Sequence, residues 1–186
     1  MLARPLAALA VATALAALPT RAGAQGFINV AAGGGIDTEG SGTVGVRAGL
    51  FKTFGLQAAF DADFLNGHPE SLDPTHPGHY RLVTGSIAFH PYLSLFSDHL
   101  GIAGHAALGL GELMSPTSTV DGSRDTRFAL TAELGPELHW FPTSILGFAF
   151  TVDWRWIWVD DPFPGFPSST PSDVVFRLWI ELSFLR

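Results

Sequence analysis

The chain has 186 residues, with 10 Lys and Arg against 17 Asp and Glu, and its formal charge is -7 at neutral pH. This acidic balance argues against nucleic-acid binding, because a phosphate backbone is neutralised by a basic surface. The sequence contains no cysteine, so the fold must form without disulfides. Its length suits a single domain.

Residues 1–24 are predicted to be a cleaved export signal and not part of the fold. A basic residue, Arg4, precedes an apolar run over residues 6–18, and the small residues Ala-Gly-Ala at 22–24 form a cleavage site. The apolar run is shorter than the roughly 20 residues that a membrane-spanning helix needs. The mature domain is therefore expected to be 25–186. No spanning helix is predicted in it, so a membrane protein would have to cross as strands.

Eight segments of the mature chain alternate large apolar residues with small or polar ones, which is typical of β-strands with two unlike faces. Each reaches the roughly 9 to 11 residues that a tilted strand needs to cross a bilayer, whereas strands in soluble proteins centre on about 5 to 6. In chain order the predicted strands are 26–36, 42–52, 55–65, 80–90, 100–112, 127–140, 145–161 and 173–184.

The segment ILGFAFTVDWRWIWVDD, residues 145–161, shows the two faces most clearly. Large apolar residues from Phe148 to Trp158 fall on one face, and Asp153 and Arg155 fall on the other. A soluble sheet could pack the aromatic face on a core, and a barrel strand could pack it on acyl chains. The opposite faces of the strands are rich in Gly, Ala and charge, which favours the lipid-facing interpretation. Because strand edges cannot face acyl chains, such a sheet must close.

The links between the predicted strands alternate in length. Polar loops at 66–79, 113–126 and 160–172 follow the third, fifth and seventh strands, while shorter links lie near 53, at 91–99 and at 141–144. Long loops at one end and short turns at the other are typical of outer-membrane barrels. The predicted fold is all-β, an eight-stranded antiparallel up-and-down transmembrane β-barrel.

Aromatic residues gather near the ends of the predicted strands, where they would form two interfacial girdles. The predicted interfacial aromatics are Tyr80, Phe128, Trp140, Trp156, Trp158 and Phe184. Pro136 falls on the lipid-facing side of the sixth strand and removes a backbone donor, so a β-bulge is expected there.

In architecture the mature chain resembles the small eight-stranded outer-membrane barrels of the OmpA/OmpX-type superfamily. Its closing segment RLWIELSF, residues 177–184, also resembles the carboxyl-terminal signal that the outer-membrane assembly machinery recognises, although residues 185–186 follow the final aromatic. The resemblance implies the outer membrane of a Gram-negative bacterium, with outer-membrane lipids and the assembly machinery as partners. It also implies an extracellular ligand at the long loops. Because this superfamily includes anchors, adhesins, defence proteins and lipid-modifying enzymes, the resemblance does not fix a role.

Charged side chains are predicted to fill the inside of the barrel, because eight strands enclose a space that side chains just fill. We interpret them as a plug of ion pairs. The predicted function is a non-conducting outer-membrane barrel that acts as an anchor or a surface-loop interaction protein. The predicted polar cluster of the lumen is Arg47, Asp61, Asp63, His105, Glu133, Glu137, His139, Asp153, Arg155, Arg177, Trp179 and Glu181.

Two alternatives remain open, an outer-membrane lipid A-modifying enzyme (acyl hydrolase or acyltransferase) and a soluble periplasmic lipid-binding barrel. The enzyme would need a histidine with a serine and an acid. The nearest candidates are His139 with Glu137 and Ser183, and His90 with Ser86, and neither matches a known motif. No catalytic residue is therefore predicted.

No cofactor and no metal are expected. The loop at 66–79 carries His68, His76 and His79 near acidic residues, which are ligand types that zinc accepts. Its prolines and irregular spacing favour a solvated loop instead.

Overall fold

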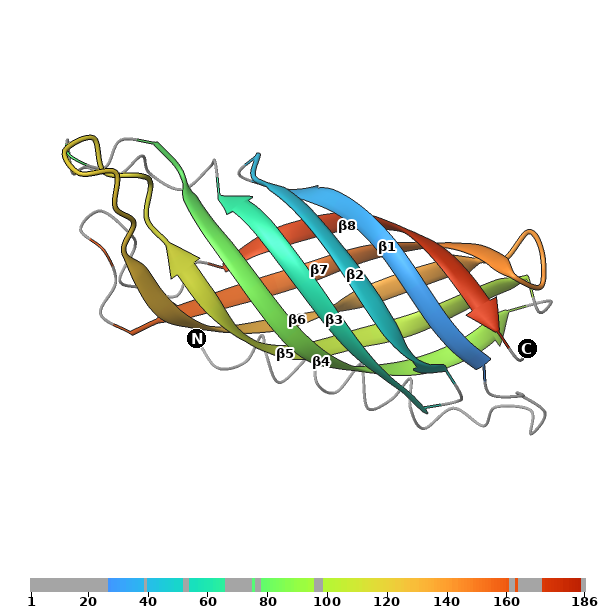
Figure 1. The fold of residues 1–186 in the computed structure, drawn as a ribbon. Helices are drawn as coiled ribbons and strands as arrows, with labels where there is room; N and C mark the ends of the chain where they lie inside the picture. Colours follow the sequence, from blue (N-terminus) through green and yellow to red (C-terminus); the bar gives the residue numbers. More distant parts are fainter. Residues whose placement is uncertain are drawn as a thin grey trace.

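The computed structural model describes residues 27–38, 40–51, 54–65, 75, 78–95, 99–160, 163 and 172–184. These residues form a closed antiparallel β-barrel of eight strands in chain order, in which β1 pairs with both β2 and β8 (Figure 1). The predicted fold is confirmed. The strands are β1 Phe27–Asp37, β2 Gly42–Phe51, β3 Phe54–Leu65, β4 Tyr80–Leu95, β5 Leu100–Met114, β6 Thr126–Trp140, β7 Leu146–Val159 and β8 Ser172–Phe184.

The register makes the strands tilt steeply across the barrel. Following paired residues from Ser183 through β1 to β7 in turn leads back to β8 at Asp173, a stagger of ten positions from 183 to 173. A closed sheet with such a stagger has strands inclined to its axis, as Figure 1 shows. The tilt lets inward residues from strands that are not adjacent meet across the lumen.

The outer surface of the barrel is apolar. Large hydrophobic side chains point outward on all eight strands, and the most exposed within the strands include Leu108 at 66% and Ile87 at 64%. Exposed apolar surface costs roughly 25 cal/mol per Å² in water, so a continuous belt of it suits acyl chains. A soluble barrel would place these side chains inside, which contradicts the alternative of a soluble lipid-binding protein. Within the described residues, no helix is long and apolar enough to cross a membrane.

One strand is longer than its sequence pattern predicts. The prediction ends the fourth strand at residue 90, but β4 continues to Leu95. Pro91 does not end the strand, because its register with β5 is the same on both sides, at Phe89 and at Tyr92. The predicted short link at 91–99 is therefore largely strand.

The bulge expected at Pro136 is absent. Leu134 pairs with Trp154 and Glu137 with Thr151, so equal numbers of residues separate these pairs on β6 and β7. A bulge would add a residue on one strand. The proline instead stays in register and only removes its own donor.

An apolar cluster lies inside the barrel at the long-loop end, and Tyr80 belongs to it. The prediction places Tyr80 in an interfacial girdle, but its side chain is only 1% exposed and stacks on Phe163 with ring centroids 5.7 Å apart. Alternation along β4 points Tyr80 inward together with Leu82. The cluster, called here the outer cap, consists of Tyr80, Leu82, Leu113, Ala129, Ile157 and Phe163.

The other predicted interfacial aromatics lie on the outer face. Phe128, Trp140, Trp158 and Phe184 are exposed, and Trp156 shares their outward alternation on β7. At the opposite end of the lumen, Phe141 is buried and packs with Tyr92. The predicted export signal lies outside the described residues.

Candidate functional site

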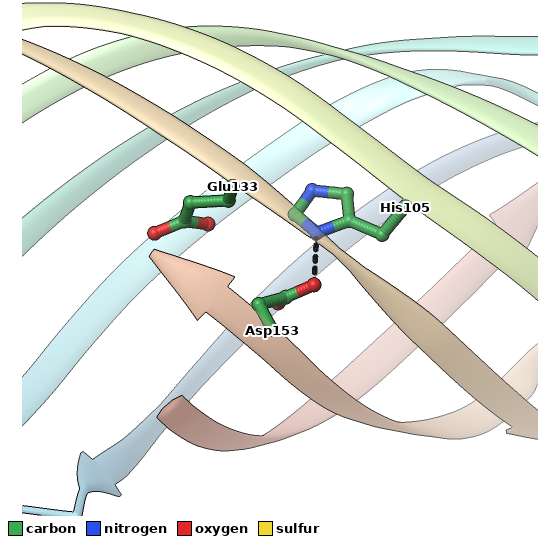
Figure 2. A group of neighbouring side chains, drawn as sticks. All are labelled: His105, Glu133 and Asp153. Carbon is green, nitrogen blue, oxygen red and sulfur yellow. Dashed lines mark hydrogen bonds and ion pairs between the residues drawn. The ribbon is translucent and has the colours of Figure 1, made fainter. Parts of the chain in front are cut away.

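The middle of the lumen holds an ion-pair group built around Arg177 of β8. Its guanidinium donates to both carboxylate oxygens of Glu133, Nη1 to Oε2 at 2.9 Å and Nη2 to Oε1 at 2.6 Å. Nη1 also lies 3.3 Å from Oδ2 of Asp153, whose Oδ1 lies 2.7 Å from Nδ1 of His105. Figure 2 shows His105, Glu133 and Asp153 converging from β5, β6 and β7. The guanidinium therefore joins β6, β7 and β8 directly, and β5 joins the group through the contact of His105 with Asp153.

A second group lies nearer the short turns, around Arg47 of β2. Its Nη2 donates to Oε1 of Glu137 and, at 2.8 Å, to Oε1 of Glu181. The guanidinium sits 4.5 Å from the ring centroid of Trp179, a cation–π contact. His139 Nδ1 lies 2.9 Å from Oε2 of Glu181. This group joins one side of the barrel to the other, since β2 and β6 are not neighbours.

His90 extends the second group toward the first. Its Nδ1 lies 2.9 Å from Oε2 of Glu137, and its ring stacks on that of His105 with centroids 4.9 Å apart. The two groups are thus in contact through a pair of imidazole rings.

A third group lies toward the long loops, around Arg155 of β7. It makes two hydrogen bonds to Asp173, Nε to Oδ1 at 3.2 Å and Nη2 to Oδ2 at 2.8 Å. Nη2 also lies 3.2 Å from Oδ2 of Asp37. The other oxygen of Asp37 accepts a hydrogen bond from the backbone of Ser41, so this carboxylate also fixes the turn between β1 and β2.

The three groups share one pattern, in which each arginine bridges two carboxylates. A buried ion is costly unless it is paired and hydrogen-bonded. Arg47, Arg155 and Arg177 are all buried, and each meets its two acids from different strands. Chemically, the three groups neutralise buried charge. The Arg47 group ties opposite walls of the barrel together, and the other two tie consecutive strands together.

The structure brings together most, but not all, of the predicted polar cluster. Ten of its members belong to the three groups and their contacts, and Asp61 is buried on the same inner wall. The side chain of Asp63 lies outside the described residues. Arg155 differs from expectation, because its partners Asp37 and Asp173 are not in the predicted cluster.

Sequence reasoning therefore missed Asp37, Asp173 and His90 as members of the network. Asp37 stands one residue past the predicted end of its strand, and Asp173 is the first residue of the last predicted strand. Continuing the inward alternation to both strand ends would have included them. The sequence pattern presents His90 as an enzyme candidate, although its alternation also points inward.

Two sets of side chains have ligand atoms close enough to hold a metal ion. They are His105 with Glu133 and Asp153, and Glu137 with His139 and Glu181, with the ligand atoms of each set within 4.8 Å of one another. In each set an arginine already contacts both carboxylates. The positively charged guanidinium occupies the place that a metal ion would take. This geometry therefore favours ion pairing over metal ligation.

The predicted enzyme candidate around His139 is not assembled. A serine nucleophile needs a base within hydrogen-bond reach. The two ring nitrogens of His139 face Glu181 at 2.9 Å and Glu137 at 3.4 Å, and the hydroxyl of Ser183 has no hydrogen-bond partner in the described part of the chain. The imidazole is engaged by acids and not by the serine.

No protein-family model matches the chain, and no curated protein matches it in sequence. Solved structures do resemble it. A major outer membrane protein from Thermus thermophilus is 14% identical with a TM-score of 0.56, over 86% of this chain and 99% of that one. Neisserial surface protein A is 8% identical with a TM-score of 0.53, over 87% and 96%. The N-terminal β-barrel domain of Pseudomonas aeruginosa OprF is 15% identical with a TM-score of 0.48, over 87% and 99%.

At such identities the likeness to the first two structures is evidence for the fold alone. It agrees with the closed sheet of eight strands and with the architectural resemblance found in the sequence. The chain has the fold of the small eight-stranded outer-membrane barrels.

Proposed function

We propose that this protein is an integral outer-membrane barrel of a Gram-negative bacterium, exported by a cleaved signal, with a filled lumen that does not conduct solutes. Its apolar outer belt and its likeness in fold to outer-membrane barrels support the location. Its role then lies in anchoring and in interactions of the long loops, with outer-membrane lipids around the belt and the assembly machinery as a partner during insertion.

The observation that carries the closed-lumen proposal is the pairing of Arg47, Arg155 and Arg177 with two carboxylates each. The pair of Arg47 with Glu137 crosses the lumen, and Arg155 and Arg177 each tie three consecutive strands together at two further levels. Apolar side chains lie inside the barrel at each end. Removing one partner of a buried pair costs about 3 to 5 kcal/mol. A solute would have to break several pairs to pass, so the barrel is proposed to stay shut.

The ligand-binding role is proposed for the long-loop end, where β5 and β6 carry the segment 115–125 beyond the other strands (Figure 1). This segment is held by its own hydrogen bonds, including Ser115 N to Asp125 O at 2.9 Å and Arg124 Nε to Thr117 Oγ1 at 2.8 Å. At its tip Val120 is 78% exposed. A structured, protruding hairpin offers an outside partner a fixed shape, which supports an interaction role for these loops.

Conductance across a planar lipid bilayer tests the closed lumen. The purified, folded protein should produce no steady current. The double variant R47A/R177A, which removes the guanidinium groups at two levels, should produce openings if it still inserts. A wild-type protein that conducts ions steadily, after insertion has been verified by its altered migration on an unheated gel, would contradict the proposal.

We propose no enzymatic activity, because the predicted group of His139, Glu137 and Ser183 is not assembled. The acyl pattern of lipid A should be the same in cells with and without the protein. A change in that pattern that H139A abolishes would replace the anchor proposal with that of a lipid-modifying enzyme.

A further inference from the structure

The lipid-facing surface has a groove over β4 to β7. Its volume is about 320 Å³, and its floor is the backbone around Gly104, which has no side chain to fill it. Two prolines flank the glycine, Pro91 on β4 and Pro136 on β6. Apolar side chains form the walls, namely Leu93, Ile102, Leu138, Phe150 and Val152.

The two prolines also interrupt the hydrogen-bond ladder at this place. The register sets Pro91 opposite Gly104 and Pro136 opposite Val152, and these pairs are missing from the ladders between β4 and β5 and between β6 and β7. Proline has no N–H, so neither Pro91 nor Pro136 donates a backbone hydrogen bond to a neighbouring strand. In hydrocarbon a missing backbone hydrogen bond is costly, because water does not replace it.

The groove lies where two prolines on different strands border one glycine. The prolines stand on the strands either side of β5, on the outward side of the alternation, and both border the same glycine; Pro136 is exposed and Pro91 is buried. Gly104 lies four positions into β5 and Pro136 four positions before the end of β6, so the groove is nearer the short turns than the long loops. At this place the apolar belt is concave.

We infer that this groove is a binding site for one acyl chain of a membrane phospholipid, held in the half of the bilayer nearer the short turns. The inference rests on the proposed location in a membrane. The occupant follows from continuity with the apolar belt, since the walls of the groove are side chains of that belt. A rigid proline on each side and a glycine floor hold a chain in one place, whereas a convex belt offers lipid no fixed position.

Photo-crosslinking in lipid vesicles tests this inference. The protein is inserted into phosphatidylethanolamine and phosphatidylglycerol vesicles that contain a trace of a phospholipid with a diazirine midway along one acyl chain. After irradiation, the labelled residues are mapped by mass spectrometry. Labels should concentrate on the groove walls, several-fold above the outward residues of β1, β2 and β8.

The variant G104L fills the groove, and G85L is its matched control. A side chain at Gly104 would lie against the Pro91 ring, with its Cβ 3.2 Å from Cγ, whereas Gly85 on β4 faces outward with nothing within 4 Å of an added Cβ. We expect G104L to lose the excess labelling several-fold and G85L to keep it.

Each outcome decides the inference. Even labelling around the wild-type barrel overturns it and needs no variant, so a failure of G104L to fold leaves the inference testable. Equal labelling of G104L and wild type also overturns it, as does a crosslinked dimer through the groove, which would make a second copy the occupant. A barrel that does not enter the vesicles contradicts the proposed function instead.

Discussion

Arg177 and Glu133 are joined by two parallel hydrogen bonds of 2.9 and 2.6 Å, although β7 lies between their strands. Asp153 on that intervening strand also contacts the guanidinium, at 3.3 Å. The pair is thus held by the tilt of the barrel and not by a direct strand pairing. These contacts stabilise the fold, and in the proposed function the same contacts keep the lumen closed.

Replacing Arg177 by Met should destabilise the barrel by about 3 to 5 kcal/mol, because Glu133 and Asp153 would stay buried without their guanidinium. Urea unfolding in vesicles measures this. In the double variant R177M/E133Q, part of the loss should be recovered, since coupled sites are not additive. R124M, on the exposed hairpin loop, is the control and should change stability by less than about 0.5 kcal/mol. Strictly additive losses would mean that the pair is not coupled.

Replacing Leu108 by Arg should cost about 2 to 4 kcal/mol in a bilayer, because a cation on the lipid face is penalised by its depth. Leu108 lies in the middle of β5 with its side chain exposed on the outer face. The same change at Val120, in the loop beyond the barrel, should be close to neutral. Unfolding free energies that are equal for the two variants would show that Leu108 does not face lipid.

Replacing Tyr80 by Ala should cost about 3 to 5 kcal/mol, the range for removing a buried aromatic side chain. The matched variant is F128A, at a residue that is 58% exposed on the outer face, and it should cost clearly less. Unfolding midpoints of the two variants distinguish an aromatic of the outer cap from one at the membrane interface. A larger loss of stability for F128A than for Y80A would indicate that Tyr80 lies at the membrane interface and not inside the barrel.

The hairpin loop at the tip should lose structure in strong acid. Hydrogen bonds from the side chain and the backbone of Ser123 lower the pKa of Asp121 to about 2, against an ordinary value near 4. A lowered carboxyl pKa gives stability that is present above the unfolded value and is lost as the pH falls through the folded value. The Ser123 amide should therefore lose protection from exchange as the pH falls from about 4 toward 2. In D121N this pH dependence should disappear, and an ordinary pKa for Asp121 in an NMR titration would contradict the assignment.

Period-two alternation is enough to predict the strands and their faces, because a strand with one apolar and one polar side has a single orientation in a barrel. It fails at Tyr80, where both faces of the segment carry apolar residues. It also ends the fourth strand at Pro91, because a missing donor is hard to distinguish from a strand end. The predicted cluster leaves out the partners of Arg155, because the inward alternation is not continued to the strand ends where Asp37 and Asp173 lie. Asp173 is the direct cross-strand neighbour of Arg155 on β8, and Asp37 lies one strand further, on β1. Contacts between distant strands, such as that of Arg47 with Glu137, depend on how all eight strands pair, which no single segment encodes.

The central claim is that a closed barrel meets lipid with its apolar face, and the chain's lack of cysteine allows a direct test. Single cysteines at Val44, Val46 and Leu50 on β2, and at Val120 in the loop, can each carry a spin label in vesicles. Collision rates with oxygen and with a water-soluble nickel complex are then measured. We expect high oxygen and low nickel accessibility at the three strand positions and the reverse at Val120. Nickel accessibility at Val46 as high as at Val120 would contradict it.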